Sequence, residues 1–171
     1  MTGSRFWRVG VYVDIQNLYL TYKYQFGAQR IDYQVLKAFL ERLYPEGVIT
    51  FHAFTAYEEG RREQMSFILA LAQIGYRVVS KPLKILPDGT KKGNLDMEIA
   101  LEILNQAPHL DEIVLVTGDG DFVPLVNQLS IMGKRVTVLG PEGATAPDLI
   151  LACHQFVSLG EVEGLYSTPN R

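Results

Sequence analysis

The chain has 171 residues, of which 47% are hydrophobic, and its formal net charge at pH 7 is −3. This length suits one buried core, and the charge excludes a polybasic nucleic-acid binder while leaving room for a local basic patch. The single cysteine, Cys153, excludes an intramolecular disulfide and a cysteine-based zinc site, and it favours a reducing cytoplasm.

Five short apolar runs are expected to form strands. Four of them are rich in β-branched residues and carry apolar residues in succession, which is typical of strands covered on both faces of a parallel sheet. The runs are residues 9–13, 48–54, 76–80, 112–116 and 135–140.

Helix-length amphipathic segments separate these runs. We expect helices at residues 33–44 (capped by Asp32), 58–74 (ended by Gly75), 91–104, 122–132 (capped by Asp121, with Pro124 in its first turn, ended by Gly133) and 146–153 (capped by Thr145). Residues 86–90 predict the turn of a small hairpin. The alternation of strands and helices indicates a doubly wound α/β sheet.

One domain should span residues 1–171, with a core at about 8–160 and a frayed C-terminal tail from residue 164. The first 14 residues lack the apolar stretch of a signal peptide. No run approaches the roughly 18 apolar residues of a membrane span, so we expect no membrane.

Polar residues follow two of the predicted strands directly. Asp14 and Asn17 follow the first strand, and Thr117, Asp119 and Asp121 follow the fourth. Ligands of open α/β sheets bind outside the carboxyl ends of the strands, so we expect these side chains to lie close together.

Asp96 is a third source of carboxylate for this edge. On a helical projection it falls in the middle of the apolar side, one turn before Ile99 and Ala100, whereas Glu98 and Glu102 fall on the opposite, outward side. A carboxylate at the inward start of an apolar stripe is unfavourable unless it is paired or bound to a metal.

Each aspartate also has an ordinary structural interpretation. Asp121 and Asp14 could cap helices, and Asp119 could be a turn residue between two glycines. Taken together, four carboxylates at one sheet edge would repel one another, and a divalent cation removes that conflict. Oxygen ligands favour Mg²⁺ or Mn²⁺ over zinc, and metal-assisted phosphodiester hydrolysis is then the leading chemistry.

Four blocks together resemble those of the NYN domain family, and more narrowly its LabA-like branch within the PIN-like nucleases. The blocks are VYVDIQNLYL, KKGNLDMEIALEIL, IVLVTGDGDFVPLVNQLSIMGKRVTVLG and TAPDLILACHQFVSL, and the resemblance covers roughly residues 8–160. It implies a PIN-like, Rossmann-like three-layer sandwich whose central, mostly parallel sheet has five or six strands.

The resemblance also implies a ribonuclease site that depends on Mg²⁺ or Mn²⁺. Carried over, the catalytic and metal-binding residues are Asp14, Asp96, Asp119 and Asp121, supported by Asn17 and Thr117. Where the family often has an acidic residue, this chain has Cys153-His154, so His154 is assigned a structural or partner-facing role.

The expected substrate is RNA, with a single strand favoured. Lysines that could contact its backbone are Lys81, Lys84, Lys91 and Lys92, and aromatic rings that could stack on bases are Tyr19, Tyr22, Tyr24 and Phe26. The alternatives are that the rings pack a helix and that the lysines only solubilise a hairpin. Association into a homodimer or with a protein partner stays open.

Two other classes of function compete with a ribonuclease. A non-catalytic RNA-binding or regulatory module could keep this fold. Other phosphoryl-transfer enzymes fit less well, because a haloacid-dehalogenase-type site would need an aspartate where Gln16 stands, and a Rossmann dinucleotide site would need a glycine fingerprint after the first strand.

Overall fold

A six-stranded, entirely parallel sheet forms the centre of the protein in a computed structural model that describes residues 5–27 and 29–167. From edge to edge its strands are β4 (Arg77–Pro82), β3 (Gly47–Tyr57), β1 (Trp7–Asp14), β7 (Glu112–Val116), β8 (Arg135–Gly140) and β9 (Gln155–Ser158). The predicted α/β sandwich with a five- or six-stranded sheet is therefore confirmed.

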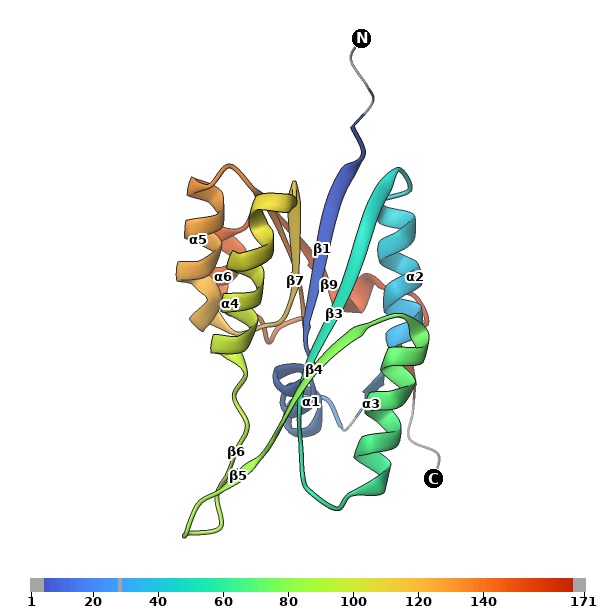
Figure 1. Cartoon of the computed structure of the whole chain (residues 1–171), viewed down its shortest axis with the longest axis vertical. Coiled ribbons are helices and arrows are strands. Elements are labelled where there is room, and N and C mark those ends of the chain that lie inside the picture. The colour runs from blue at the N-terminus through green and yellow to red at the C-terminus, as the bar shows by residue number, and fades with distance from the viewer. Residues whose placement is uncertain (1–4, 28, 168–171) are drawn as a thin grey trace.

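Within the described residues, six α-helices cover the two faces of this sheet. They are α1 (Ile15–Gln25), α2 (Tyr33–Leu43), α3 (Arg62–Ile74), α4 (Asp96–Gln106), α5 (Val123–Ile131) and α6 (Pro147–Ala152). Side chains of α1, α2 and α3 pack in one core cluster, and those of α4, α5 and α6 pack in the other. Figure 1 shows the resulting three layers, with α1 beneath the lower ends of the central strands. No helix within the described ranges is both long and apolar enough to cross a membrane.

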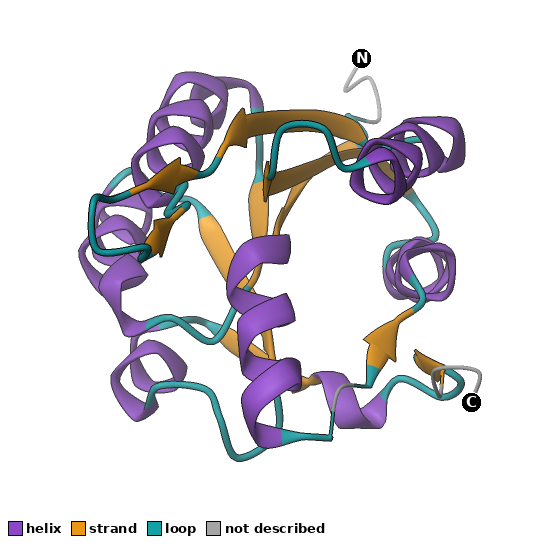
Figure 2. Ribbon diagram, turned by 90° about the horizontal axis from the view of Figure 1, so that it is seen from below, coloured by secondary structure: helices purple, strands orange, loops and turns teal. Residues whose placement is uncertain are grey.

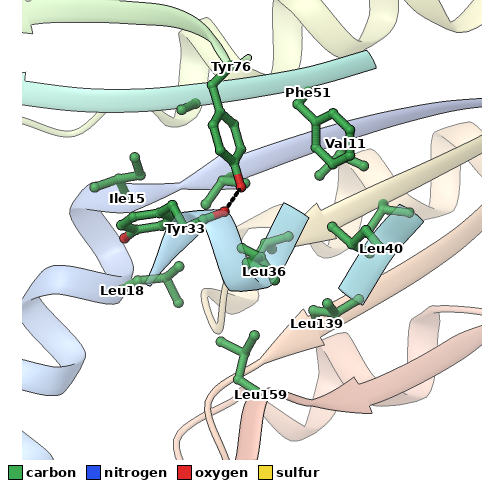
Figure 3. Close-up of a cluster of buried hydrophobic side chains, with 14 of the residues drawn as sticks. Val11, Ile15, Leu18, Tyr33, Leu36, Leu40, Phe51, Tyr76, Leu139 and Leu159 are labelled. Atoms are coloured by element: carbon green, nitrogen blue, oxygen red, sulfur yellow. Dashed lines mark hydrogen bonds between the residues drawn. The ribbon is translucent and has the colours of Figure 1, made fainter. Parts of the chain in front are cut away.

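The two cores follow from the two-residue period of the strands. Val9, Val11 and Val13 of β1 point into the cluster under α1 to α3, whereas Tyr12 points into the other. In the first cluster Leu36, Leu40, Phe51 and Leu139 surround Val11, and the Tyr76 hydroxyl donates to the Tyr33 carbonyl oxygen at 2.6 Å (Figure 3). The central strands are thus buried on both faces, which fixes where their carboxyl ends lie.

Several predicted helix ends are confirmed. The Asp32 carboxylate accepts hydrogen bonds from the N–H groups of Gln34 and Val35, and Gly75 ends α3 with a φ of 117°. Pro124 lies in the first turn of α5, where its missing N–H has no helical partner to lose.

Two predicted caps are wrong. Asp121 lies inside a short 3₁₀ turn, η2 (Gly120–Phe122), whose cap is Asp119, and α5 then starts without a side-chain cap. Thr145 does not cap α6, because its hydroxyl donates to the Pro141 carbonyl oxygen at 2.8 Å. In the first loop the cap is an aspartate two residues earlier, and in the second a backbone carbonyl oxygen takes the threonine hydroxyl.

Short elements complete the fold. Two further 3₁₀ turns, η1 (Ala107–His109) and η3 (Leu159–Glu161), close connections between the longer elements, and β5 (Lys84–Ile85) pairs with β6 (Lys91–Lys92) in the predicted hairpin. The strands β2 (Arg30–Ile31) and β10 (Tyr166–Ser167) form a second small pair that was not predicted.

The predicted frayed tail is wrong for residues 164–167. Leu165 is fully buried, and the hydroxyl groups of Tyr166 and Tyr22 are 2.7 Å apart. The rest of that tail, residues 168–171, lies outside the described residues.

Candidate metal centre

The site lies where two neighbouring strands end. β1 and β7 are parallel and in register, with Val13 opposite Val116, so Asp14 and Thr117 follow side by side. Figure 2 views the molecule from this end of the sheet. The backbone alone therefore brings Asp14 close to Thr117, as the strand order predicted.

Three carboxylates meet at this edge. One oxygen from each of Asp96, Asp119 and Asp121 lies within 4.8 Å of the other two. We call these three residues the acidic cluster. Among residues 5–27 and 29–167, no lysine, arginine or histidine forms an ion pair with a residue of the acidic cluster or with Asp14. The cluster therefore holds negative charge that no side chain in this part of the chain neutralises.

Asp14 lies beside the acidic cluster but deeper in the protein. It is 2% exposed, its Oδ1 accepts from the Asn17 N–H at 3.2 Å, and its Oδ2 accepts from the Thr117 hydroxyl at 3.0 Å. Burial raises the pKa of Asp14 to about 7; the two hydrogen bonds oppose this rise, and the charges of Asp96 and Asp119 add to it. Asp14 thus caps α1, as its structural interpretation predicted, and lies beside the acidic cluster.

Asn17 and Thr117 join α1 to the loop after β7. The Asn17 Oδ1 accepts from the Gly118 N–H at 3.1 Å and lies 3.2 Å from the Thr117 Oγ1. The Thr117 Oγ1 in turn accepts from the Asp119 N–H at 3.2 Å. These two residues therefore fix the positions of Asp14 and Asp119 relative to each other.

Asp96 is the first residue of α4, on the inward side that the helical projection predicted. Leu95 and Ile99 on either side of it are buried in the core. The Asn94 Oδ1 accepts from the Asp96 N–H at 2.6 Å, and the Asn94 Nδ2 donates to the Asp96 Oδ2 at 3.2 Å. Burial raises the pKa of Asp96, and the nearby Asp119 raises it further. Sequence reasoning missed Asn94, although an asparagine two residues before a helix start is a recognisable signal.

Two glycines place Asp119 and Asp121 in the loop after β7. Neither Gly118 nor Gly120 has a positive φ, so backbone conformation does not explain why glycine stands there. A Cβ on Gly118 would lie 2.8 Å from the Ala144 carbonyl oxygen, and one on Gly120 would lie 2.9 Å from the Ala146 Cβ. The glycines are needed because the β8–α6 loop packs directly against this segment.

Glu98 and Glu102 lie on the same helix as Asp96 but outside the acidic cluster, as predicted. They do not simply face solvent, because they form ion pairs with the edge strand β4: Lys81 with Glu98 at 2.8 Å and Arg77 with Glu102 at 3.2 Å. Lys81, predicted to contact RNA, is thus held by a carboxylate.

Some of the other residues predicted to contact RNA are likewise held by the protein, and others are exposed. Lys91 forms an ion pair with Glu58, whereas Lys84 and Lys92 are exposed and have no ion pair within the described part of the chain. Of the aromatic residues, Tyr22 is buried in the core, while Tyr19 is 56% exposed and Tyr24 is 74% exposed. The core-packing interpretation is therefore correct for Tyr22, and base stacking stays a prediction for Tyr19 and Tyr24.

His154 has a structural role. Its Nδ1 accepts a hydrogen bond from the Val136 N–H at 3.0 Å, so the side chain secures the start of β8. Neither it nor Cys153 belongs to the acidic cluster.

The fold and the acidic cluster together define an α/β protein of PIN-like architecture with an oxygen-rich site at the carboxyl edge of its sheet. The chain belongs to the NYN domain family, which its residues 8–160 match. The family resemblance stated from the sequence is thereby confirmed.

Relatives support the narrower LabA-like assignment. The chain is 28% identical to the low amplitude and bright protein LabA of Synechococcus elongatus over 172 residues, which cover 96% of this chain and 90% of that protein. It is 31% identical over 71 residues to the uncharacterized protein MJ0482 of Methanocaldococcus jannaschii, covering 40% and 30% of the two chains.

A solved structure has the same fold along nearly the whole chain. The crystal structure of VPA0982 from Vibrio parahaemolyticus, a protein of unknown function, superposes with a TM-score of 0.84 at 28% identity, covering 98% of this chain and all of that one. The three-layer architecture is therefore shared with a relative of solved structure.

Proposed function

We propose that this protein is a metal-dependent ribonuclease that hydrolyses phosphodiester bonds of RNA at the carboxyl edge of its sheet. The observation that carries the proposal is the acidic cluster with Asp14 beside it, four carboxylates without a cationic side chain as partner in the described ranges. Such an arrangement is unfavourable in the metal-free protein and becomes favourable around a divalent cation.

The donor set fits Mg²⁺ or Mn²⁺, because it consists of carboxylate oxygens without cysteine or histidine. Asp96, Asp119 and Asp121 would hold the ion, which supplies a water nucleophile and polarises a phosphoryl oxygen. Both oxygens of Asp14 already accept hydrogen bonds from Asn17 and Thr117, so this residue orients the loop behind the cluster.

The position of the acidic cluster suits a polymeric substrate. A cavity of about 620 Å³ lies around the first half of β3, lined by residues such as Lys37, Thr50 and His52, and none of the site aspartates lines it. Asp121 is exposed, Asp96 and Asp119 are half-buried, and Asp96 follows the lysine-bearing hairpin β5–β6 closely in the chain, so a long RNA chain that contacts the hairpin can reach the cluster. The expected compartment is the cytoplasm.

A cleavage assay tests this function. The purified chain should cleave single-stranded RNA in the presence of Mg²⁺ or Mn²⁺, and EDTA should stop the reaction. Asp119→Asn should lower the rate by about 10²-fold or more, because it weakens the electrostatic field that the reaction uses. The matched control is Asp148→Asn, the same chemical change at an exposed position on α6, which should leave the rate unchanged.

The same assay distinguishes a ribonuclease from a non-catalytic RNA-binding module. If the wild type and Asp119→Asn cleave equally, the activity comes from a contaminant and the ribonuclease proposal fails. RNA binding without any metal-stimulated cleavage would favour the binding module.

A further inference from the structure

Helix α1 has a second, exposed face that the core does not use. Ile15, Leu18 and Tyr22 fill the core side, whereas Leu20 is 42% exposed and Tyr24 is 74% exposed. Leu20 and Tyr24 follow Asn17 at helical positions i+3 and i+7, so they share its face. Since Asn17 contacts Gly118 of the site loop, this exposed face starts at the acidic cluster and runs away from it.

A lysine lies between two exposed rings on this helix. The Lys23 Nζ is 5.7 Å from the centroid of the Tyr19 ring and 5.4 Å from that of Tyr24. We call Tyr19, Leu20, Lys23 and Tyr24 the α1 surface. It combines flat aromatic groups with a positive charge, whereas an ordinary solvated helix face would be mainly polar.

The hairpin β5–β6 carries further positive charge that is linked to the α1 surface. Glu58 joins the two, because it forms ion pairs with Lys91 of the hairpin and, at 2.7 Å, with Arg61, and because Lys23 contributes to lowering the pKa of its carboxyl. Two cations therefore pair with the Glu58 carboxylate, and the charge of Lys23 acts on it from a longer distance.

Positive charge exceeds negative charge in the segments 15–25, 58–62 and 84–92 taken together, although the whole chain carries −3. Their cations are Lys23, Arg61, Arg62, Lys84, Lys91 and Lys92, and their carboxylates are Glu58, Glu59 and Asp88. An excess of cations beside exposed rings is complementary to a polyanion that has flat bases.

We infer that the α1 surface binds an unpaired stretch of RNA that continues from the acidic cluster, with bases stacked on Tyr24 and packed on Leu20, and phosphates near Lys23 and the hairpin lysines. This inference rests on the proposed ribonuclease function and adds the residues that select an unpaired strand. A duplex covers both faces of each base, so only an unpaired strand can use these side chains.

The binding test uses the full chain carrying Asp119→Asn, with Mg²⁺, constant salt and a labelled single-stranded RNA of about 12 nucleotides. Tyr24→Ala should weaken binding about 10-fold, since stacking contributes roughly 1–3 kcal/mol per base. Tyr24→Phe keeps the ring and should stay within about 2-fold of the parent by the same reasoning. Phe6→Ala is the matched control, because Phe6 is an exposed aromatic residue at the opposite end of β1.

A second readout separates binding from catalysis. In the wild-type background Tyr24→Ala should raise KM and leave kcat nearly unchanged, because the ring contacts substrate away from the reacting bond. Leu20→Ala, at another exposed position, should weaken binding in the same direction and provides a second variant if Tyr24→Ala melts at a lower temperature.

Several outcomes would overturn the inference without touching the proposed function. These are unchanged affinity in both Tyr24→Ala and Leu20→Ala, equal affinity for a duplex and a single strand, or no detectable RNA binding by a chain that still cleaves RNA. A chain whose Asp119→Asn variant cleaves as fast as the wild type would instead overturn the function itself.

Discussion

The buried carboxyl of Asp14 makes the stability of the metal-free protein depend on pH. Its ordinary pKa of 3.8 in the unfolded chain becomes about 7 in the folded protein. Between these values the folded state holds a proton that the unfolded state has lost. The free energy of unfolding should therefore fall as pH rises through this window, by up to roughly 1.4 kcal/mol per pH unit, and level off above it.

Urea unfolding in EDTA at several pH values measures this slope, and Asp14→Asn should remove its contribution. An Asp14→Asn variant with the same slope as the wild type would mean that Asp14 is ionised throughout and that its burial has no such effect.

Asp119 distinguishes a metal site from a set of structural aspartates. In EDTA, Asp119→Asn should raise stability by about 1 kcal/mol, since it relieves repulsion with Asp96 and an asparagine oxygen can still accept from the Asp121 N–H. The wild type should gain roughly 2.7 kcal/mol at a Mn²⁺ concentration about 100 times the dissociation constant, and the variant much less. Thermal melts of the wild type and the variant, each in EDTA and in Mn²⁺ at constant salt, provide the four stabilities that this comparison needs. A lower melting temperature of the variant in EDTA, with no Mn²⁺ shift in the wild type, would support capping alone.

At the scale of elements, the loop after β7 depends on close backbone packing. Gly118→Ala would bring a Cβ to 2.8 Å from the Ala144 carbonyl oxygen, which is backbone and cannot rotate away. We expect a loss of about 1–3 kcal/mol in stability and slower RNA cleavage, because the strain displaces Asp119. Urea unfolding and the cleavage assay measure both. Unchanged stability in Gly118→Ala would mean that the β8–α6 loop moves freely and does not position Asp119.

The elements that could be predicted from the sequence are those whose pattern is local. The runs at 112–116 and 135–140 became β7 and β8 with unchanged bounds, because their continuous apolar residues require burial on both faces. β9 was not identified, since only Val157 among its four residues is buried and an edge strand needs no such run. β10 was missed because its pairing with β2 joins residues far apart in the chain.

The same distinction applies to the site. The order of strands was enough to bring Asp14, Asp119 and Asp121 to one edge, and helical periodicity was enough to turn Asp96 inward. The separation of a buried Asp14 from the three clustered carboxylates was not predictable, because it depends on the Thr117 hydroxyl, a contact across 103 positions of the chain. The pairing of Lys91 with Glu58 likewise depends on how the hairpin lies against the end of β3.

At the scale of the whole molecule, the apolar cores that stabilise the fold and the candidate metal site occupy different parts of the protein. Two apolar cores hold the parallel strands, and the acidic cluster and Asp14 lie together at one end of the sheet, beside the α1 surface and the cationic hairpin. Because parallel strands end together, a single sheet edge can present residues from distant parts of the chain to one substrate.

The central claim is that the acidic cluster binds a divalent cation, and anomalous diffraction from crystals soaked in Mn²⁺ tests it most directly. The account predicts an anomalous peak between the carboxylates of Asp96, Asp119 and Asp121, with metal–oxygen distances of about 2.0–2.3 Å, and no peak at this position in Asp119→Asn crystals. A fully soaked wild-type crystal without a peak among these three carboxylates would contradict it.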